Sequence, residues 1–155
     1  MTSFSCLLTG NEPLTVECGK RLIEAGHQIK AVATKRAVVA DWARSAGLTV
    51  LDGSAALADS DEPVDWLFSI ANLEMIPGVV LARATNGAVN FHDGPLPRYA
   101  GLNAPVWAIL GGEDAYGITW HLMEDGADLG DILVSQTVTI SEEETAFTLN
   151  AKCFA

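Results

Sequence analysis

Two side chains that can act on a carbonyl group stand two residues apart in this chain, Asn90 and His92. They end the apolar run GAVNFH, and alternate residues of an extended strand point to opposite faces. The amide and the imidazole are therefore expected on one face, with Phe91 turned the other way into the core. An amide N–H can stabilise an oxyanion and an imidazole can move a proton, so the pair is suited to polarising a carbonyl and transferring a proton.

A carboxylate would complete this set, because it orients the imidazole that moves the proton. A Gly- and Pro-rich loop follows His92, and a second loop further along the chain carries Asp125, Asp128 and Asp131. The residue pattern alone does not choose among these three aspartates. His92 ends a buried strand in an α/β pattern, and open α/β sheets bind their ligands beyond the strand ends, which favours a functional role for this histidine.

The other two histidines have simpler interpretations. His27 follows Gly26 at the end of a predicted helix, where a surface or capping role is favoured. His121 lies in the alternating stretch ITWHLM, so it is either a buried residue with a polar partner or an exposed one on a strand face. We favour a structural role for it over a direct chemical one.

The elements that must position these residues follow from apolar periodicity and from Gly and Pro punctuation. The pattern predicts strands over Ser3–Gly10, Gln28–Thr34, Leu48–Leu51, Val64–Ile70, Gly87–His92, Tyr116–Met123 and Asp131–Ile140. It predicts helices over Leu14–Ala25, Ala37–Ser45, Gly78–Arg83 and Ala104–Leu110. Strands that alternate with helices predict an α/β fold, with a Rossmann-like, mostly parallel twisted sheet and helices on both faces. The last two strands, joined by a loop over 124–130, are expected to be an antiparallel C-terminal pair.

The C-terminal segment predicts one more helix. Ser141 and Glu144 have the spacing of a capping box, and an apolar stripe follows it at Ala146, Leu149, Ala151 and Cys153. The chain stops at Ala155 with no helix stop signal. We therefore expect residues 1–155 to be one catalytic domain that is cut within its last helix, with further domains after Ala155.

Composition restricts the partners. The 155 residues carry a formal net charge of −11, which repels nucleic-acid phosphates, so no nucleic-acid partner is expected. No apolar run approaches the roughly 18 residues of a membrane span, and the first residues lack a signal-peptide pattern. We predict a cytoplasmic protein with no membrane partner. The three cysteines are widely spaced, and no ligand cluster for a metal is visible.

A dinucleotide site is not predicted either. The first strand–helix turn would need three glycines in a G-x-G-x-x-G pattern to approach a pyrophosphate. Gly10 is the only one of the three that is present. A nucleotide-dependent oxidoreductase, or an unrelated α/β enzyme, is therefore the weaker alternative.

The stretch over 90–131 resembles the signature of the 10-formyltetrahydrofolate-dependent formyltransferases. Its order and spacing match that family at Asn90-Phe91-His92, Leu96-Pro97, Tyr99-Ala100-Gly101, Gly117-Ile118-Thr119 and Asp128-Leu129-Gly130-Asp131. Across residues 1–89 the order of elements agrees, but few side chains are diagnostic. The resemblance implies a formyltransferase that uses 10-formyltetrahydrofolate as the formyl donor and needs no metal.

The resemblance also implies roles for individual positions. Asn90, His92 and Asp128 fall on the catalytic Asn-His-Asp triad of the family, so the resemblance selects Asp128 where the pattern left three candidates. Two segments of this chain correspond to the folate-binding segments of relatives, which hold the pterin mostly through backbone groups. The cofactor-binding residues implied in this way are Leu73, Met75, Ile76, Pro77, Met123, Glu124, Asp125 and Asp128.

The variant HDGPLPRYAGLNAPVWA with ITWH is most similar to amino-sugar formyltransferases and to formyltransferase-like domains of modular peptide or polyketide synthetases. The implied acceptor is an amino sugar, or another small or carrier-bound amine. One alternative stays open beside the enzyme. A non-catalytic module of a larger multidomain synthetase could bind folate or a partner with the same fold.

Overall fold

The computed structural model describes residues 2–124 and 126–155, and its strands follow the order β3-β2-β1-β4-β5-β6-β7. The chain divides into two compact units, Met1–Val89 (unit 1) and Asn90–Ala155 (unit 2). The predicted fold class is confirmed: a mostly parallel seven-stranded sheet with helices, ending in an antiparallel strand pair.

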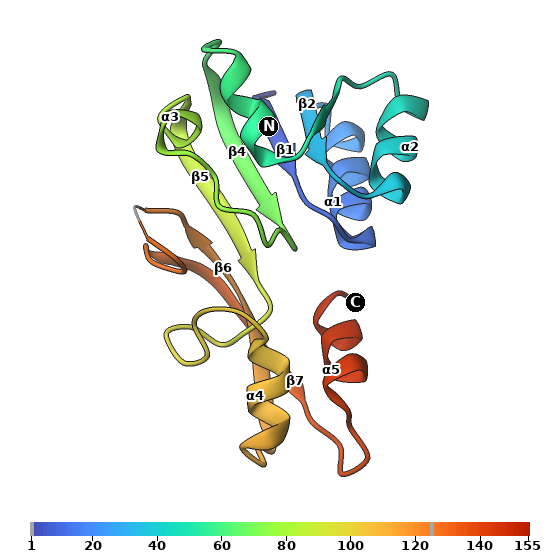
Figure 1. Ribbon diagram of the computed structural model, residues 1–155, viewed down its shortest axis with the longest axis vertical. Coiled ribbons are helices and arrows are strands. Elements are labelled where there is room, and N and C mark those ends of the chain that lie inside the picture. The colour runs from blue at the N-terminus through green and yellow to red at the C-terminus, as the bar shows by residue number, and fades with distance from the viewer. Residues whose placement is uncertain (1, 125) are drawn as a thin grey trace. The chain divides into compact units, whose positions relative to one another are not determined.

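Unit 1 is built on four parallel strands, drawn in blue to green in Figure 1: β1 (Ser5–Thr9), β2 (Gln28–Thr34), β3 (Val50–Asp52) and β4 (Val64–Ile70). β1 lies between β2 and β4, and Leu7 is in register with Leu67. Both leucines are buried, as expected for a strand covered on two faces. The apolar stretches that predicted strands are therefore the core of this unit.

The helices of unit 1 are α1 (Pro13–Glu24), α2 (Ala37–Ser45), the short 3₁₀ helix η1 (Ser54–Asp59) and α3 (Gly78–Leu81). α1 starts with a proline, whose missing N–H costs nothing at a first helical position. It ends before Gly26, whose φ of 83° is the left-handed conformation that glycine adopts easily. α1 and α2 lie side by side and contact β2 (Figure 1).

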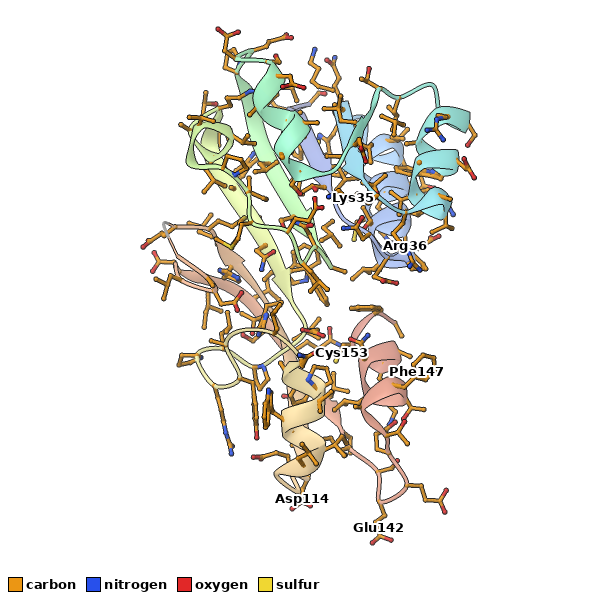
Figure 2. The ribbon with its side chains drawn as sticks, in the orientation of Figure 1. Lys35, Arg36, Asp114, Glu142, Phe147 and Cys153 are labelled. Carbon is orange, nitrogen blue, oxygen red and sulfur yellow. The ribbon has the colours of Figure 1, made fainter. Side chains whose placement is uncertain are left out.

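Strand β5 (Ala84–His92) begins in unit 1 and ends in unit 2. The rest of unit 2 consists of α4 (Ala104–Leu110), β6 (Ala115–Leu122), β7 (Ile132–Thr139) and α5 (Ala146–Cys153). β6 and β7 form the antiparallel pair, with Gly117 opposite Thr137. α4 and α5 pack together over a small apolar cluster that includes Ala108, Leu149 and Cys153. Figure 2 shows Phe147 on the side of α5 that faces away from α4.

Apart from shifts of a few residues at the ends of several elements, such as β1, α3 and β5, three details differ from the sequence prediction. The helix η1 was not predicted, because SAALAD is short and has no clear periodicity. The predicted capping box at Ser141 is wrong: α5 is capped by Thr145, which exchanges hydrogen bonds with Thr148, while Ser141 Oγ donates to Glu144 within a turn. Ala151 is exposed, so the apolar stripe of α5 is narrower than predicted.

A search of the helices among residues 2–124 and 126–155 finds none with both the length and the apolar character needed to cross a bilayer.

Candidate active site

The end of β5 carries Asn90 and His92 into unit 2. Phe91 between them is buried, and its ring packs at 5.1 Å from Trp120 and 5.9 Å from Phe154, measured between ring centroids. Strand alternation turns the two polar side chains away from this aromatic contact. His92 is nevertheless buried, with 6% of its surface exposed, so its ring nitrogens need partners inside the protein.

His92 has an oxygen near each ring nitrogen. Nε2 lies 2.8 Å from the backbone oxygen of Tyr99, and because a carbonyl can only accept, Nε2 carries the hydrogen. Nδ1 lies 3.5 Å from Oδ1 of Asp128. The neutral ring therefore presents a basic Nδ1 to the carboxylate. A protonated ring would find an acceptor beside both nitrogens.

Asp128 is held where it can face this ring. Its backbone φ is 53°, a left-handed value that is uncommon for residues other than glycine. Its Oδ2 accepts a hydrogen bond of 2.7 Å from the backbone N–H of Gly101, which leaves Oδ1 directed at the imidazole. Of the other two candidate aspartates, Asp131 is exposed and Asp125 lies outside the described residues.

His121 links Asn90 to the carboxylate. Its Nδ1 lies 2.7 Å from the backbone oxygen of Leu122 and 3.2 Å from that of Leu129, so Nδ1 carries the hydrogen. In the neutral ring Nε2 is then an acceptor, and the side-chain NH₂ of Asn90 donates to it at 3.1 Å. The same Nε2 lies 3.8 Å from Oδ1 of Asp128. Four side chains thus form one continuous array: Asn90, His121, Asp128 and His92.

His121 takes the first of the two settings that the sequence left open: it is buried, with 1% of its surface exposed, and it has polar partners. A signal was available, because His121 stands two residues after Thr119 on an alternating strand and shares its face. Thr119 is also buried, and its hydroxyl donates to the backbone oxygen of Gly94 at 2.8 Å and accepts from the N–H of Leu96 at 3.1 Å. β6 therefore supports both the array and the loop after β5.

The loop after β5 fits closely around the imidazole. At Gly94 a Cβ atom would lie 2.7 Å from Nε2 of His92, so glycine is required for the ring to take this position. Asp93 stands beside it. Burial raises the pKa of its carboxyl group, a positive charge on a protonated His92 would lower this pKa, and the negative charge of Asp128 raises it further. Asp93 therefore interacts electrostatically with two members of the array, His92 and Asp128.

Comparison with known protein families identifies the family of the chain that carries this array. A family model described as formyl transferase matches residues 58–154, which is more than half of the chain. The chain belongs to the formyl transferase family. The matched segment contains the whole array of unit 2.

Individual relatives agree with this formyl transferase assignment. The chain is 38% identical over 85 residues to the GDP-perosamine N-formyltransferase of Brucella melitensis, a match that covers 55% of the chain and 33% of the relative. The chain therefore matches about a third of the length of this curated relative. Glycinamide ribonucleotide transformylase 1 from Symbiobacterium toebii has a TM-score of 0.82 at 23% identity, covering 98% of this chain and 81% of its own. A 4-N formyltransferase from Francisella tularensis has a TM-score of 0.78 at 19% identity, covering 97% and 62%. The two structural likenesses establish the fold.

The predicted donor-binding residues lie in two segments of the chain. In unit 1, Leu73 and Met75 are exposed by 80% and 75%, whereas Ile76 is buried and Pro77 precedes α3. In unit 2, Met123 is half-buried and Glu124 is exposed, after the end of β6. Each segment therefore has solvent-exposed residues that a ligand could contact: Leu73 and Met75 in unit 1, and Glu124 in unit 2.

The unit 1 segment is held by polar side chains. Asn72 donates to the backbone oxygen of Glu74 at 2.9 Å, and the carboxylate of Glu74 accepts from the backbone N–H of Ser54 at 2.7 Å. Lys35 pairs with Glu74 at 2.6 Å; this hydrogen bond lowers the pKa of Glu74 and raises that of Lys35. Leu73 and Met75 therefore project from a fixed turn.

Among the described residues, no group of three or more His, Cys, Asp and Glu side chains is placed to hold a metal ion.

Proposed function

We propose that this protein transfers the formyl group of 10-formyltetrahydrofolate to the amine of a small acceptor, with an amino sugar as the preferred class. The observation that carries the proposal is the array of Asn90, His121, Asp128 and His92 in a member of the formyl transferase family. The amino-sugar preference is supported by the relative named GDP-perosamine N-formyltransferase.

The reaction forms a bond from the amine nitrogen to the formyl carbon and breaks the bond from that carbon to N10 of the folate. One proton leaves the amine and one proton is added to N10. Negative charge develops on the formyl oxygen as the amine attacks. The protein must therefore supply a hydrogen-bond donor for this oxygen and a group that carries a proton.

Asn90 is the donor. One N–H of its amide is used by Nε2 of His121, and this bond fixes the amide plane and directs the NH₂ group rather than the oxygen toward the ring. The second N–H is then available for the formyl oxygen. A donor that is oriented before the reaction needs no reorganisation as charge develops, and removal of one such donor costs roughly 10²–10³-fold in rate.

His92 and Asp128 transfer the proton that leaves the amine. Nδ1 of the neutral His92 ring is a base, and Oδ1 of Asp128 at 3.5 Å stabilises the proton it receives. The proton then reaches N10 from His92 or through a water held by Asp128. The buried setting of the ring limits competition from bulk solvent.

The apolar side chains of Leu73 and Met75, with the backbone near Met123 and Glu124, are proposed to contact the folate donor. Large exposed apolar side chains on a fixed turn are suited to the flat face of a pterin. The donor is a substrate here, because it is consumed in the reaction.

The test is a turnover assay of the purified protein with 10-formyltetrahydrofolate and a panel of amines: nucleotide-linked amino sugars, free amino sugars, and a carrier-bound aminoacyl group. Release of tetrahydrofolate and the mass of the product are both measured. We expect formylation of at least one amino sugar. Binding of folate analogues in a thermal-shift assay, without turnover of any amine, would instead support a non-catalytic module.

Asp128→Asn separates binding from chemistry. The amide keeps the size of the side chain but removes the charge that faces Nδ1 of His92. We expect most turnover to be lost while folate analogues still bind. Loss of folate binding alone, with the rate of bound substrate unchanged, would make Asp128 a binding residue.

A further inference from the structure

We propose that Glu113 is a positioning residue that acts through Tyr99 to hold the imidazole of His92 in its Nε2–H form. The inference rests on the proposed function, because it assigns a role in that reaction to a side chain outside the array. Glu113 follows the end of α4. Its two partners in the loop after β5 lie 15 and 14 residues before it in the sequence.

Glu113 holds the outer side of the loop by two contacts. Its Oε1 accepts a hydrogen bond of 2.7 Å from the phenol of Tyr99, and the same oxygen pairs with the guanidinium group of Arg98. The guanidinium also lies over the ring of Tyr99, 5.1 Å from its centroid. The hydrogen bond to Glu113 raises the pKa of Tyr99, which keeps the phenol as an O–H donor.

The inner side of the same loop contacts the array at two points. The backbone oxygen of Tyr99 accepts from Nε2 of His92, and two residues later the N–H of Gly101 donates to Oδ2 of Asp128. The segment Tyr99–Gly101 therefore sets the positions of the imidazole and the carboxylate together. A shift of this segment would change which nitrogen of His92 carries the hydrogen.

The backbone of Tyr99 needs an external restraint. Its φ is 61°, a left-handed value that an aromatic residue rarely adopts unless the surroundings impose it. The phenol–carboxylate bond is a restraint that acts on Tyr99 itself. Glu113 is suited to this task because its side chain is only 18% exposed, so little of it is free to move in solvent. Its negative charge is balanced by Arg98, whose side chain is 67% exposed.

Four variants separate the parts of this contact. Glu113→Ala removes both bonds of the carboxylate, and Tyr99→Phe removes the phenol bond while keeping the backbone oxygen. Glu113→Gln keeps an acceptor for the phenol but loses the charge. Arg98→Met removes the ion pair and the contact of the guanidinium with the Tyr99 ring, but leaves the phenol–carboxylate bond. Asp114→Asn is the matched control, because Asp114 is the next residue, is exposed, and lies just before β6 (Figure 2).

We expect Glu113→Ala and Tyr99→Phe to lower kcat by roughly 10- to 100-fold with little change in KM for the formyl donor, because a misplaced proton-transfer group affects the rate and not the binding of substrate. Glu113→Gln should recover most of the loss, and Asp114→Asn should match the wild type. If Glu113→Ala does not fold, Tyr99→Phe removes the same hydrogen bond from the other side. Wild-type kcat in both variants would overturn the proposal, and so would an equal loss in Glu113→Gln.

A second measurement does not depend on turnover. Nitrogen-15 NMR of histidine-labelled protein distinguishes the two tautomers of each imidazole, and a His92→Gln variant assigns the signals. We expect an Nε2–H signal for His92 in the wild type and a mixture of tautomers in Tyr99→Phe. An unchanged tautomer in Tyr99→Phe would refute the role of Glu113. If the wild type formylates no amine, the proposed function fails, and the NMR comparison still decides whether Glu113 orients His92.

Discussion

Unit 1 and unit 2 use their polar side chains differently. In unit 1 the polar groups at the strand ends satisfy one another: Asn11 accepts from Thr34 and from the backbone of Lys35, and Glu74 accepts from Lys35 and Ser54. In unit 2, Asn90, His121, Asp128 and His92 form the array to which we assign the proposed chemistry, while the buried Thr119 supports the loop after β5. The polar contacts named in unit 1 therefore serve the scaffold, and those of the array are proposed to serve the reaction.

Backbone conformation shows the same contrast. Among the described residues, four other than glycine have a positive φ, and three of them belong to unit 2: Tyr99, Asn103 and Asp128. Two of these three contact His92 directly. Left-handed non-glycine residues cost free energy and persist where the surroundings impose them, commonly at functional sites. Unit 2 therefore holds most of these left-handed residues, and the fourth, Ala71, lies in unit 1.

Charge adds to the difference. Unit 2 carries half of the acidic residues of the chain, but Arg98 and Lys152 are its only lysine or arginine side chains. The array thus sits in the more acidic unit. We expect substitutions in the array to change the rate and substitutions in the core of unit 1 to change the stability.

The largest effect is expected from His92→Ala. The proton-transfer group is lost, so turnover should fall by roughly 10²–10⁴-fold. The free energy of unfolding, measured by urea denaturation, should change much less than the activation free energy does. Turnover near the wild-type level would remove His92 from the mechanism and end the contrast between the units.

A core substitution in unit 1 should give the opposite result. Leu67 is fully buried in β4, and Leu67→Ala should lower the free energy of unfolding by about 2–5 kcal/mol through lost burial and a cavity. The rate per folded molecule should stay close to that of the wild type. Leu73→Ala is the control for stability, because an exposed leucine should cost less than about 0.5 kcal/mol. A large rate loss in Leu67→Ala without a stability loss would contradict the division of roles.

His121→Gln tests the histidine that orients Asn90. Without the ring that accepts from the amide, the amide can rotate, and kcat should fall by roughly 10- to 100-fold. His27→Gln is the matched control, since His27 stacks on Phe4 in unit 1 at 3.6 Å between ring centroids. Equal kinetics for the two variants would show that Asn90 needs no support from His121.

The smallest effect concerns the ion pair between Glu144, just before α5, and Lys152 in the last turn of that helix. Hydrogen bonds from Lys152, Thr148 and Ser141 lower the pKa of Glu144 from an ordinary value of 4.5 to about 2. A carboxyl group whose pKa is lowered by folding stabilises the protein at pH values above its ordinary pKa. This stabilisation is lost as the pH falls toward the folded-state pKa of about 2.

Glu144→Gln should therefore lower Tm slightly at neutral pH, and its difference from the wild type should shrink as the pH falls below 4.5. Calorimetry across this range measures both. Glu17→Gln, which breaks an exposed pair with Lys20 on α1, is the control and should have almost no effect. A Tm difference that grows on acidification would reverse the assigned sign.

Much of the fold could be predicted because the apolar pattern is strong where the strands are buried. The bounds of β2, α2, β4 and α4 agree with the prediction. The pattern failed where local hydrogen bonds decide the outcome. η1 contains a single large buried residue, Leu57, and the cap of α5 depends on whether Ser141 or Thr145 completes a reciprocal bond.

The candidate site divides in the same way. The alternation of β5 is visible in the sequence, so the common face of Asn90 and His92 could be predicted. Asp125, Asp128 and Asp131 have the same chemistry and similar positions in the loop, and periodicity does not rank residues in an irregular segment. The sequence left the setting of His121 open, because its partners come together only in the folded chain. These partners are the backbone oxygens of Leu122 and Leu129 and the amide of Asn90.

The sequence by itself indicated the family, the order of the strands and α-helices, and the residues proposed to act on a formyl group, since these follow from residue type and spacing. The tertiary structure decided which nitrogen of each histidine carries its hydrogen and which oxygen of Asp128 faces His92. Those features depend on backbone groups of Tyr99, Gly101 and Leu122, and every residue type carries the same backbone atoms. Only the path of the folded chain brings them to the side chains they orient.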